Sequence, residues 1–256
     1  MDKIYLILAT LVFLGGFVIA VAALRSGKHG SGRLNIGLAI VGVIFQSLFL
    51  RERGELHGRC PITNGAEVLV FISWSVVIMY LALGRPFRLS LLGMFSMPLV
   101  FLFQSVAIVS LLINDPGARP PKALDPWLEM HAAMSLLAYG AFGLACIAGV
   151  MDLVLDRQLK SHEPGRLFYS LPPMRYLYMA ILRLFIIGTG LLSIGIVAAF
   201  FMDELPSPIH FYGSGAVWLV YASLLGVHLV KGFPPKRLSK AAIAAFVLAL
   251  LTLSLL

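Results

Sequence analysis

The stretch WLEMHAAMSLLAYGAFG, residues 127–143, opens an apolar run that continues to about residue 154. About 20 consecutive apolar residues are enough for a helix to cross the hydrocarbon core of a bilayer, so this run predicts a membrane-spanning helix. It also carries a histidine, His131, close to its beginning. An imidazole inside a membrane helix is costly and usually faces a partner, a cavity or a cofactor. The role of His131 is therefore the central question that this sequence raises.

Apolar runs of the same kind recur along the whole chain. By length they predict about eight transmembrane helices, near residues 4–24, 34–50, 67–84, 89–113, 128–154, 178–202, 213–231 and 238–256. Hydrophobic residues make up 59% of the chain and charged residues only 12%, whereas soluble domains carry about 25% charged residues. The composition predicts an all-α polytopic membrane protein, organised as a single integral membrane domain over residues 1–256.

The basic residues are concentrated in alternate connections between the predicted helices. The first, third, fifth and seventh connections are rich in Lys and Arg, while acids balance or exceed bases in the others. Basic short loops face the cytoplasm, so we expect both termini on the outer, periplasmic side. The net charge of +8 is explained by contact with the lipid bilayer, and no nucleic-acid partner is expected.

Four histidines lie in or beside the predicted helices and are candidates for binding. His57, His131 and His210 fall on the outer side, and His228 lies near the inner end of the seventh helix. At about 1.5 Å per residue, His228 lies about 22 Å below the start of its helix, too deep to share a metal with His131. Imidazole pairs suit iron, including haem iron, and His131 could meet His210. Each of these histidines also suits an ordinary hydrogen-bonded role at the membrane interface.

Polar and aromatic side chains follow one face of two predicted helices. They are His131, Ser135, Tyr139 and Phe142 on the fifth helix and Ser214, Trp218, Tyr221 and His228 on the seventh. Such faces suit a flat aromatic cofactor, but they also suit helix packing through small residues.

Nothing in the sequence indicates catalysis. Asp152 and Asp156 come at the inner end of the fifth helix beside Arg157 and Lys160, which indicates a helix end in solvent rather than a proton relay. The sequence has no HExxH, GxSxG, P-loop or dinucleotide-binding motif. We therefore predict no catalytic residue and favour a protein that is not an enzyme.

Four segments, taken in order, resemble the cytochrome c assembly protein family (CcsA/CcmC type), and most closely its HemX/YpjD-like branch. GRCPITNGAEVLVFISW (58–74) is similar to the family's Gly-x-x-Pro segment and the Phe-x-x-Trp helix that follows it. WLEMHAAMSLLAYGAF (127–142) is similar to its Trp-Leu-x-x-His-x-x-x-Ser-x-x-x-Tyr helix. Residues 171–196 and 217–233 resemble two later helices of that branch. The resemblance covers about residues 51–250.

The resemblance implies a haem site on the outer face. His131 corresponds to the family's outward haem-ligating histidine, so haem b would be the cofactor, its iron bound by His131 and, as a second candidate, by His210. The full set of candidate haem-binding residues is His131, His210, His228, His57, Trp127, Tyr139 and Trp218.

The tryptophan-rich signature of the synthase branch is missing, and LPSPIHFYGS (205–214) stands in its place. What the resemblance implies is a haem-holding accessory of cytochrome c biogenesis, multi-pass in a bacterial inner (plasma) membrane. Its partners would be haem, other cytochrome c biogenesis membrane proteins or apocytochrome c. The alternative is a HemX-type membrane regulator or scaffold of tetrapyrrole biosynthesis that binds no haem. A solute transporter and a b-type electron-transfer cytochrome are lesser alternatives.

Overall fold

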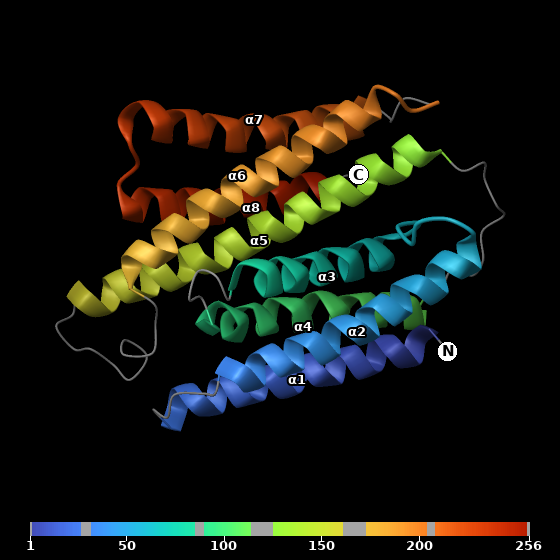
Figure 1. Ribbon diagram of the computed structural model, residues 1–256, viewed down its shortest axis with the longest axis horizontal. Coiled ribbons are helices and arrows are strands. Elements are labelled where there is room, and N and C mark those ends of the chain that lie inside the picture. The colour runs from blue at the N-terminus through green and yellow to red at the C-terminus, as the bar shows by residue number, and fades with distance from the viewer. Residues whose placement is uncertain are drawn as a thin grey trace. The chain divides into compact units, whose positions relative to one another are not determined.

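The computed structural model describes residues 2–26, 32–84, 90–113, 125–160, 173–203 and 208–254 (Figure 1). All regular structure in these residues is α-helical. The helices are α1 (Asp2–Ser26), α2 (Gly32–His57), α3 (Gly65–Gly84), α4 (Ser90–Ile113), α5 (Pro126–Lys160), α6 (Met174–Ala199), α7 (Pro208–Lys231) and α8 (Pro235–Ser254). The prediction of an all-α protein with about eight helices is confirmed.

Seven helices in the described part of the chain, α1 to α7, are long and apolar enough to cross a membrane. α8 is not among these seven; Lys236, Arg237 and Lys240 fall within its first six residues. The chain is a multi-pass helical membrane protein. The orientation of its termini stays a prediction.

Three helix ends lie well outside the predicted bounds. α2 continues past Leu50 through RERGELH to His57, a segment that the predicted bounds leave between two helices. α5 continues past residue 154 to Lys160, and α7 begins at Pro208 rather than at residue 213. α2 is followed directly by Gly58, whose φ of 62° is the left-handed conformation that glycine adopts readily after a helix C-terminus.

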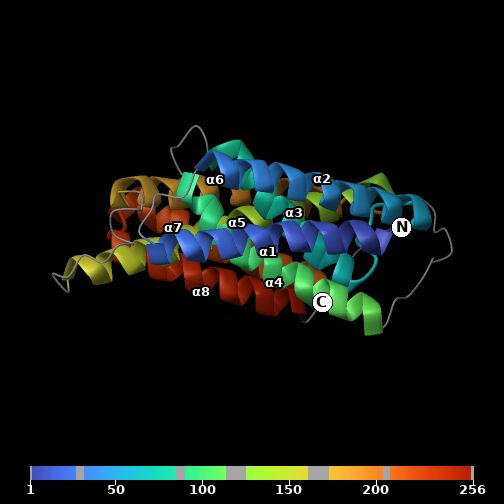
Figure 2. The same cartoon turned by 90° about the horizontal axis from the view of Figure 1, so that it is seen from below.

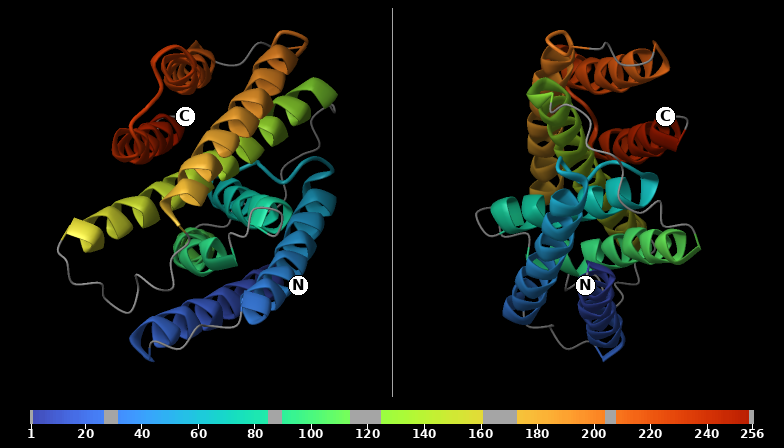
Figure 3. Two further views of the ribbon diagram at one scale, coloured as in Figure 1. Left: turned by 60° about the vertical axis from the view of Figure 1, so that its left-hand side comes forward. Right: turned by 90° about the vertical axis from the view of Figure 1, so that its right-hand side faces the viewer.

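The helices form two compact units, Met1–Leu124 with α1 to α4 and Asp125–Leu256 with α5 to α8. In the first unit α1 packs against α2 and α4, and α3 packs against α4 and α2 (Figure 2). In the second unit α5 and α6 lie side by side, α8 packs against α5, and α7 packs against α6 and α8 (Figure 3). A single domain over residues 1–256 stays a prediction.

Close approach of α5 to its neighbours depends on two glycines. A Cβ atom on Gly195 of α6 would lie 2.8 Å from Ser135 Oγ. A Cβ atom on Gly149 of α5 would lie 2.8 Å from the carbonyl oxygen of Ser239 on α8. Small residues allow membrane helices to pack backbone against backbone, so α5 is held closely by both α6 and α8.

Candidate functional site

His131 is half-buried near the start of α5, where it contacts the backbone of α6. Its Nδ1 atom lies 2.8 Å from the carbonyl oxygen of Gly195. A carbonyl oxygen only accepts hydrogen bonds, so Nδ1 carries the proton and donates it. The lone pair is then on Nε2. This tautomer, fixed by a bond to a backbone carbonyl, is typical of histidines that bind metals.

The same end of α5 carries aromatic side chains. Trp127, one turn before His131, packs its ring against Phe201 with centroids 5.0 Å apart and is 42% exposed. The helix begins at Asp125, whose Oδ1 accepts the backbone N–H of Trp127 at 2.9 Å. Its Oδ2 accepts the N–H of Asp203 at 3.1 Å. Asp125 therefore ties the start of α5 to the segment that follows α6.

Trp218 lies on the other side of α6 from His131. Its Nε1–H donates to Ser193 Oγ at 2.8 Å. Ser193 and Gly195 are two residues apart, which is a turn of about 200° around a helix. The structure does not bring Trp218 and His131 together.

The two polar-aromatic faces predicted on α5 and α7 do meet, but deeper in the unit. Phe142 and Tyr221 stack with centroids 3.5 Å apart and planes 4° apart, and Phe185 of α6 contacts Tyr221 edge-on at 5.0 Å. Tyr139 is also buried in this region. No third ring fits between Phe142 and Tyr221, so these faces pack against each other here.

His228 lies in the last turn of α7 and contacts the start of α6. The hydroxyl of Tyr178 donates to the carbonyl oxygen of Phe233 at 3.1 Å, and its oxygen lies 3.2 Å from His228 Nδ1. Because the hydroxyl has a single hydrogen, Nδ1–H of His228 is the donor in the second bond. His228 is thus held at the end of α6 opposite to His131.

His210 falls in the first turn of α7. The next residue, Phe211, contacts Phe200, and Phe201 contacts Trp127, so the start of α7 is at the same end of the second unit as the start of α5. The side-chain position of His210 lies outside the described residues. The pairing of His131 with His210 stays a prediction.

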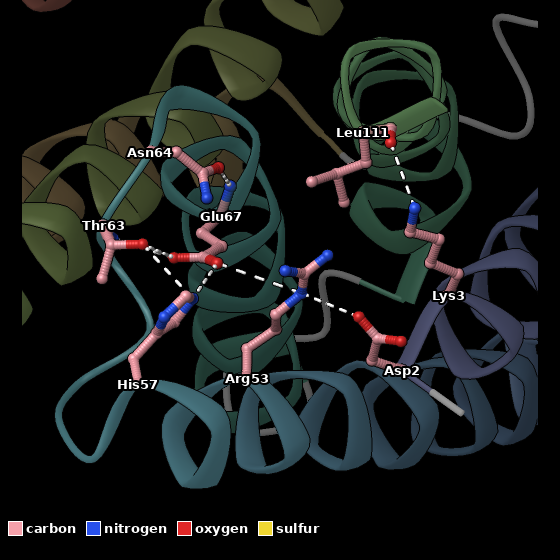
Figure 4. A network of polar contacts seen from close by, with 8 residues as sticks. All are labelled: Asp2, Lys3, Arg53, His57, Thr63, Asn64, Glu67 and Leu111. Carbon is pink, nitrogen blue, oxygen red and sulfur yellow. Dashed lines mark hydrogen bonds and ion pairs between the residues drawn. The ribbon is translucent and has the colours of Figure 1, made fainter. Parts of the chain in front are cut away.

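His57 is fully buried, although the sequence places it in an outer connection. Its Nε2 lies 3.0 Å from Glu67 Oε1 and 3.4 Å from Thr63 Oγ1 (Figure 4). Nε2 is therefore engaged with a carboxylate of the same unit. His57 acts here as part of a polar network between α2 and α3.

That network contains charged residues that our sequence reasoning missed. Glu67 Oε2 accepts both the N–H and the hydroxyl of Thr63 at 2.8 Å. Arg53, only 1% exposed, places Nε 2.8 Å from Asp2 Oδ2 and 4.0 Å from Glu67 Oε1. Asn64 Oδ1 accepts the N–H of Glu67 at 3.0 Å, which caps α3. The Asn-x-x-Glu spacing at a helix start is the one sequence signal that could have indicated this arrangement.

Among the described residues no group of three or more His, Cys, Asp or Glu side chains is placed to hold a metal ion. Haem is a different case, because the porphyrin itself holds the iron and the protein would need to add as little as one histidine. A single histidine in the state of His131 fits that requirement.

The structure defines a class: polytopic helical membrane proteins in which a histidine at one end of a tightly packed helix pair is hydrogen-bonded to a backbone carbonyl. A sequence profile of the Cytochrome C assembly protein family matches residues 62–255. The chain belongs to this family, as its sequence motifs indicated.

Individual relatives agree with this assignment. Protein HemX from Brevibacillus brevis is 28% identical over 166 residues, which is 64% of this chain and 60% of that protein. Protein HemX from Bacillus subtilis (strain 168) is 24% identical over 208 residues, 78% of this chain and 75% of that protein. Cytochrome c biogenesis protein CcsA from Nostoc punctiforme is 26% identical over 154 residues, 59% of this chain and 42% of that protein. The likeness to HemX confirms the predicted branch.

Proposed function

We propose that this protein is a haem-holding accessory of cytochrome c biogenesis and binds haem b at the end of α5 that carries His131. The observation that carries the proposal is the hydrogen bond from His131 Nδ1 to the carbonyl oxygen of Gly195. Haem, when bound, supplies an iron atom with axial positions for protein ligands. The ligands of the iron and the aromatic surface beside it would come from the chain itself.

His131 would offer Nε2 to the iron of a bound haem. The Gly195 carbonyl holds the ring in one orientation, as outer hydrogen-bond partners do for metal-bound histidines. The Gly195 carbonyl is part of the backbone of α6 and also accepts the hydrogen bond from His131 of α5. Its position is therefore determined by α6 and by the packing of α5 against it. His210, at the start of α7, is the second candidate ligand because it lies at the same end of the second unit.

Trp127 and Phe201 provide the aromatic surface beside His131. Their rings contact each other, and both are more than one-third exposed, so a porphyrin could bury apolar area against them. Trp218 contacts the other side of α6, and Tyr139 is buried two turns deeper. We assign these two residues to packing behind the site.

The relatives support the remainder of the proposal. CcsA is named as a cytochrome c biogenesis protein, and both HemX relatives come from bacteria. We therefore place the protein in a bacterial inner membrane, where it would pass haem to other cytochrome c biogenesis proteins or to apocytochrome c.

The test is the visible absorption spectrum of detergent-purified protein from cells grown with ample haem precursor. We expect a Soret band with low-spin features in the wild type, and its loss in His131→Ala. His228→Ala is the matched control, because it removes a histidine at the opposite end of α6, and should keep the band. A band of equal strength in His131→Ala would contradict the assignment of the ligand.

A second candidate function is that of a HemX-type membrane regulator or scaffold of tetrapyrrole biosynthesis without haem. It is favoured by the extent of the HemX match, 78% of this chain, and by the stacking of Phe142 on Tyr221. Folded wild-type protein that shows no Soret band in the presence of haem would support this function instead. The basic connections would then be the surface to probe for a soluble partner.

A further inference from the structure

Asp152 and Asp156 are one helical turn apart on α5 but lie in opposite environments. Asp156 pairs with Lys160 at 2.9 Å and with Lys236 of α8 at 3.3 Å. Asp152 is fully buried. The sequence suggested a solvent-exposed helix end for both residues, and this is wrong for Asp152. The difference arises because α8 packs against the part of α5 that carries Asp152.

Ser239 of α8 contacts both Asp152 and the backbone of its own helix. Ser239 Oγ lies 2.6 Å from Asp152 Oδ2 and 3.1 Å from the carbonyl oxygen of Pro235. If Ser239 donates to Asp152, its single hydrogen leaves the Pro235 carbonyl with a shared bond at most. A protonated Asp152 that donates to Ser239 Oγ leaves the Ser239 hydrogen free for Pro235 and satisfies both contacts. The 2.6 Å separation fits either direction.

The other carboxyl oxygen favours the protonated state. Asp152 Oδ1 is buried and has no hydrogen-bond partner among the described residues. An ionised carboxylate with a bare buried oxygen would lose its hydration without compensation, a cost that buried groups avoid by becoming neutral. A protonated carboxyl leaves only a carbonyl-like oxygen unpaired, which is far less costly.

Contacts between α5 and α8 determine where this proton could exchange. On one side of the Asp152–Ser239 pair, Gly149 packs so closely on the Ser239 backbone that a Cβ atom would lie 2.8 Å from its carbonyl oxygen. On the other side, one turn away, lies the Asp156–Lys236 ion pair with both side chains partly exposed. Partly exposed polar side chains therefore lie on the Asp156 side of Asp152, and close helix packing lies on its Gly149 side.

We propose that the contact between α5 and α8 is a proton-binding site, in which Asp152 is a neutral acid that donates to Ser239 Oγ. The bound proton exchanges with the aqueous phase at the Asp156–Lys236 end. The site is independent of haem, because every contact that forms it comes from side chains and backbone at the end of α5 far from His131.

The test is infrared difference spectroscopy of the haem-free protein in detergent at neutral pH. We expect a protonated-carboxyl C=O band that is absent in Asp152→Asn and shifts after transfer to D₂O. Asp156→Asn is the matched control and should keep the band, because Asp156 is ionised in its pair with two lysines. An unchanged acid region in folded Asp152→Asn would overturn the proposal.

A second variant keeps the proposal testable if Asp152→Asn does not fold. Ser239→Ala retains the carboxyl but removes the acceptor of its proton. We expect the acid band to remain and to move in frequency, because the O–H group loses its 2.6 Å partner. No band in this region in either the wild type or Ser239→Ala would show that Asp152 is ionised.

Discussion

His131 and His228 are hydrogen-bonded to opposite ends of one helix, α6. His131 bonds to Gly195 and His228 to Tyr178, and the seventeen residues between these two positions correspond to about 25 Å of helix. The hydrocarbon core of a bilayer is about 30 Å thick. One haem therefore cannot bind both histidines, and any second axial ligand beside His131 must come from its own end of the unit.

The position of His131 depends on the absence of a side chain at residue 195. In Gly195→Ala the new Cβ would lie 2.8 Å from Ser135 Oγ and 3.2 Å from the carbonyl oxygen of His131. α5 and α6 must then move apart, and we expect a loss of about 1–3 kcal/mol of stability, the usual cost of overpacking. Haem affinity should fall with it, because the bond that orients His131 is stretched. Helical circular dichroism during unfolding in mixed micelles, and haem titration, measure the two effects.

Gly190 is the matched control for this prediction. It lies on the same helix, but a Cβ atom there meets nothing within 4 Å. Gly190→Ala should leave haem binding unchanged and keep or slightly raise stability, because alanine favours helix more than glycine does. Equal effects of the two substitutions would show that the close approach at Gly195 does not position His131.

Arg53 should be among the most sensitive residues of the first unit. It is buried and pairs with Asp2 and Glu67, so Arg53→Ala leaves the buried Glu67 carboxylate and the partly exposed Asp2 carboxylate without their cation. Breaking a buried ion pair in this way costs about 3–5 kcal/mol. Arg51, two residues earlier on α2, pairs with Glu55 at the surface, and Arg51→Ala should have little effect. The unfolding free energies of both variants in mixed micelles test the prediction, which fails if the two losses are similar.

The long apolar segments were predictable from sequence because burial in hydrocarbon depends on composition over about 20 residues. The charged segment RERGELH was misplaced for a related reason. Its local composition indicates solvent, whereas Arg53 and His57 are buried by partners elsewhere in the chain, Asp2 and Glu67. Pairing between distant residues leaves no trace in a local pattern.

The candidate site was also only partly predictable from the sequence. The sequence identified His131 from its position in a membrane helix and from a family motif. It could not identify the partner, because the Gly195 carbonyl is a backbone atom whose position depends on how α5 packs against α6. Likewise, the burial of Asp152 depends on α8, which follows in the chain about 80 residues later.

His57 should be structural and not a haem ligand. Its Nε2 is engaged by Glu67 in a fully buried contact, so His57→Ala opens a cavity and leaves Glu67 with one partner fewer. We expect lower stability of the fold but an unchanged absorption spectrum in the protein that remains folded. Spectra normalised to folded protein separate the two effects. A Soret band that weakens more than the folded fraction would mean that His57 takes part in haem binding.

Variants of Tyr221 and Phe142 test whether the aromatic interior of the second unit only packs or also binds a ligand. Its ring stacks on Phe142 and contacts Phe185, while its hydroxyl is buried with no hydrogen-bond partner among the described residues. An unsatisfied buried hydroxyl costs about 1–3 kcal/mol, so Tyr221→Phe should raise stability by about 1 kcal/mol and keep the stack. Phe142→Ala, which removes the stack, should lower it by about 3–5 kcal/mol. Unfolding in mixed micelles measures both changes.

A loss of stability or of bound haem in Tyr221→Phe would contradict this prediction. It would show that the Tyr221 hydroxyl binds a ligand or a buried water. The contact between α5 and α7 would then be part of a binding site.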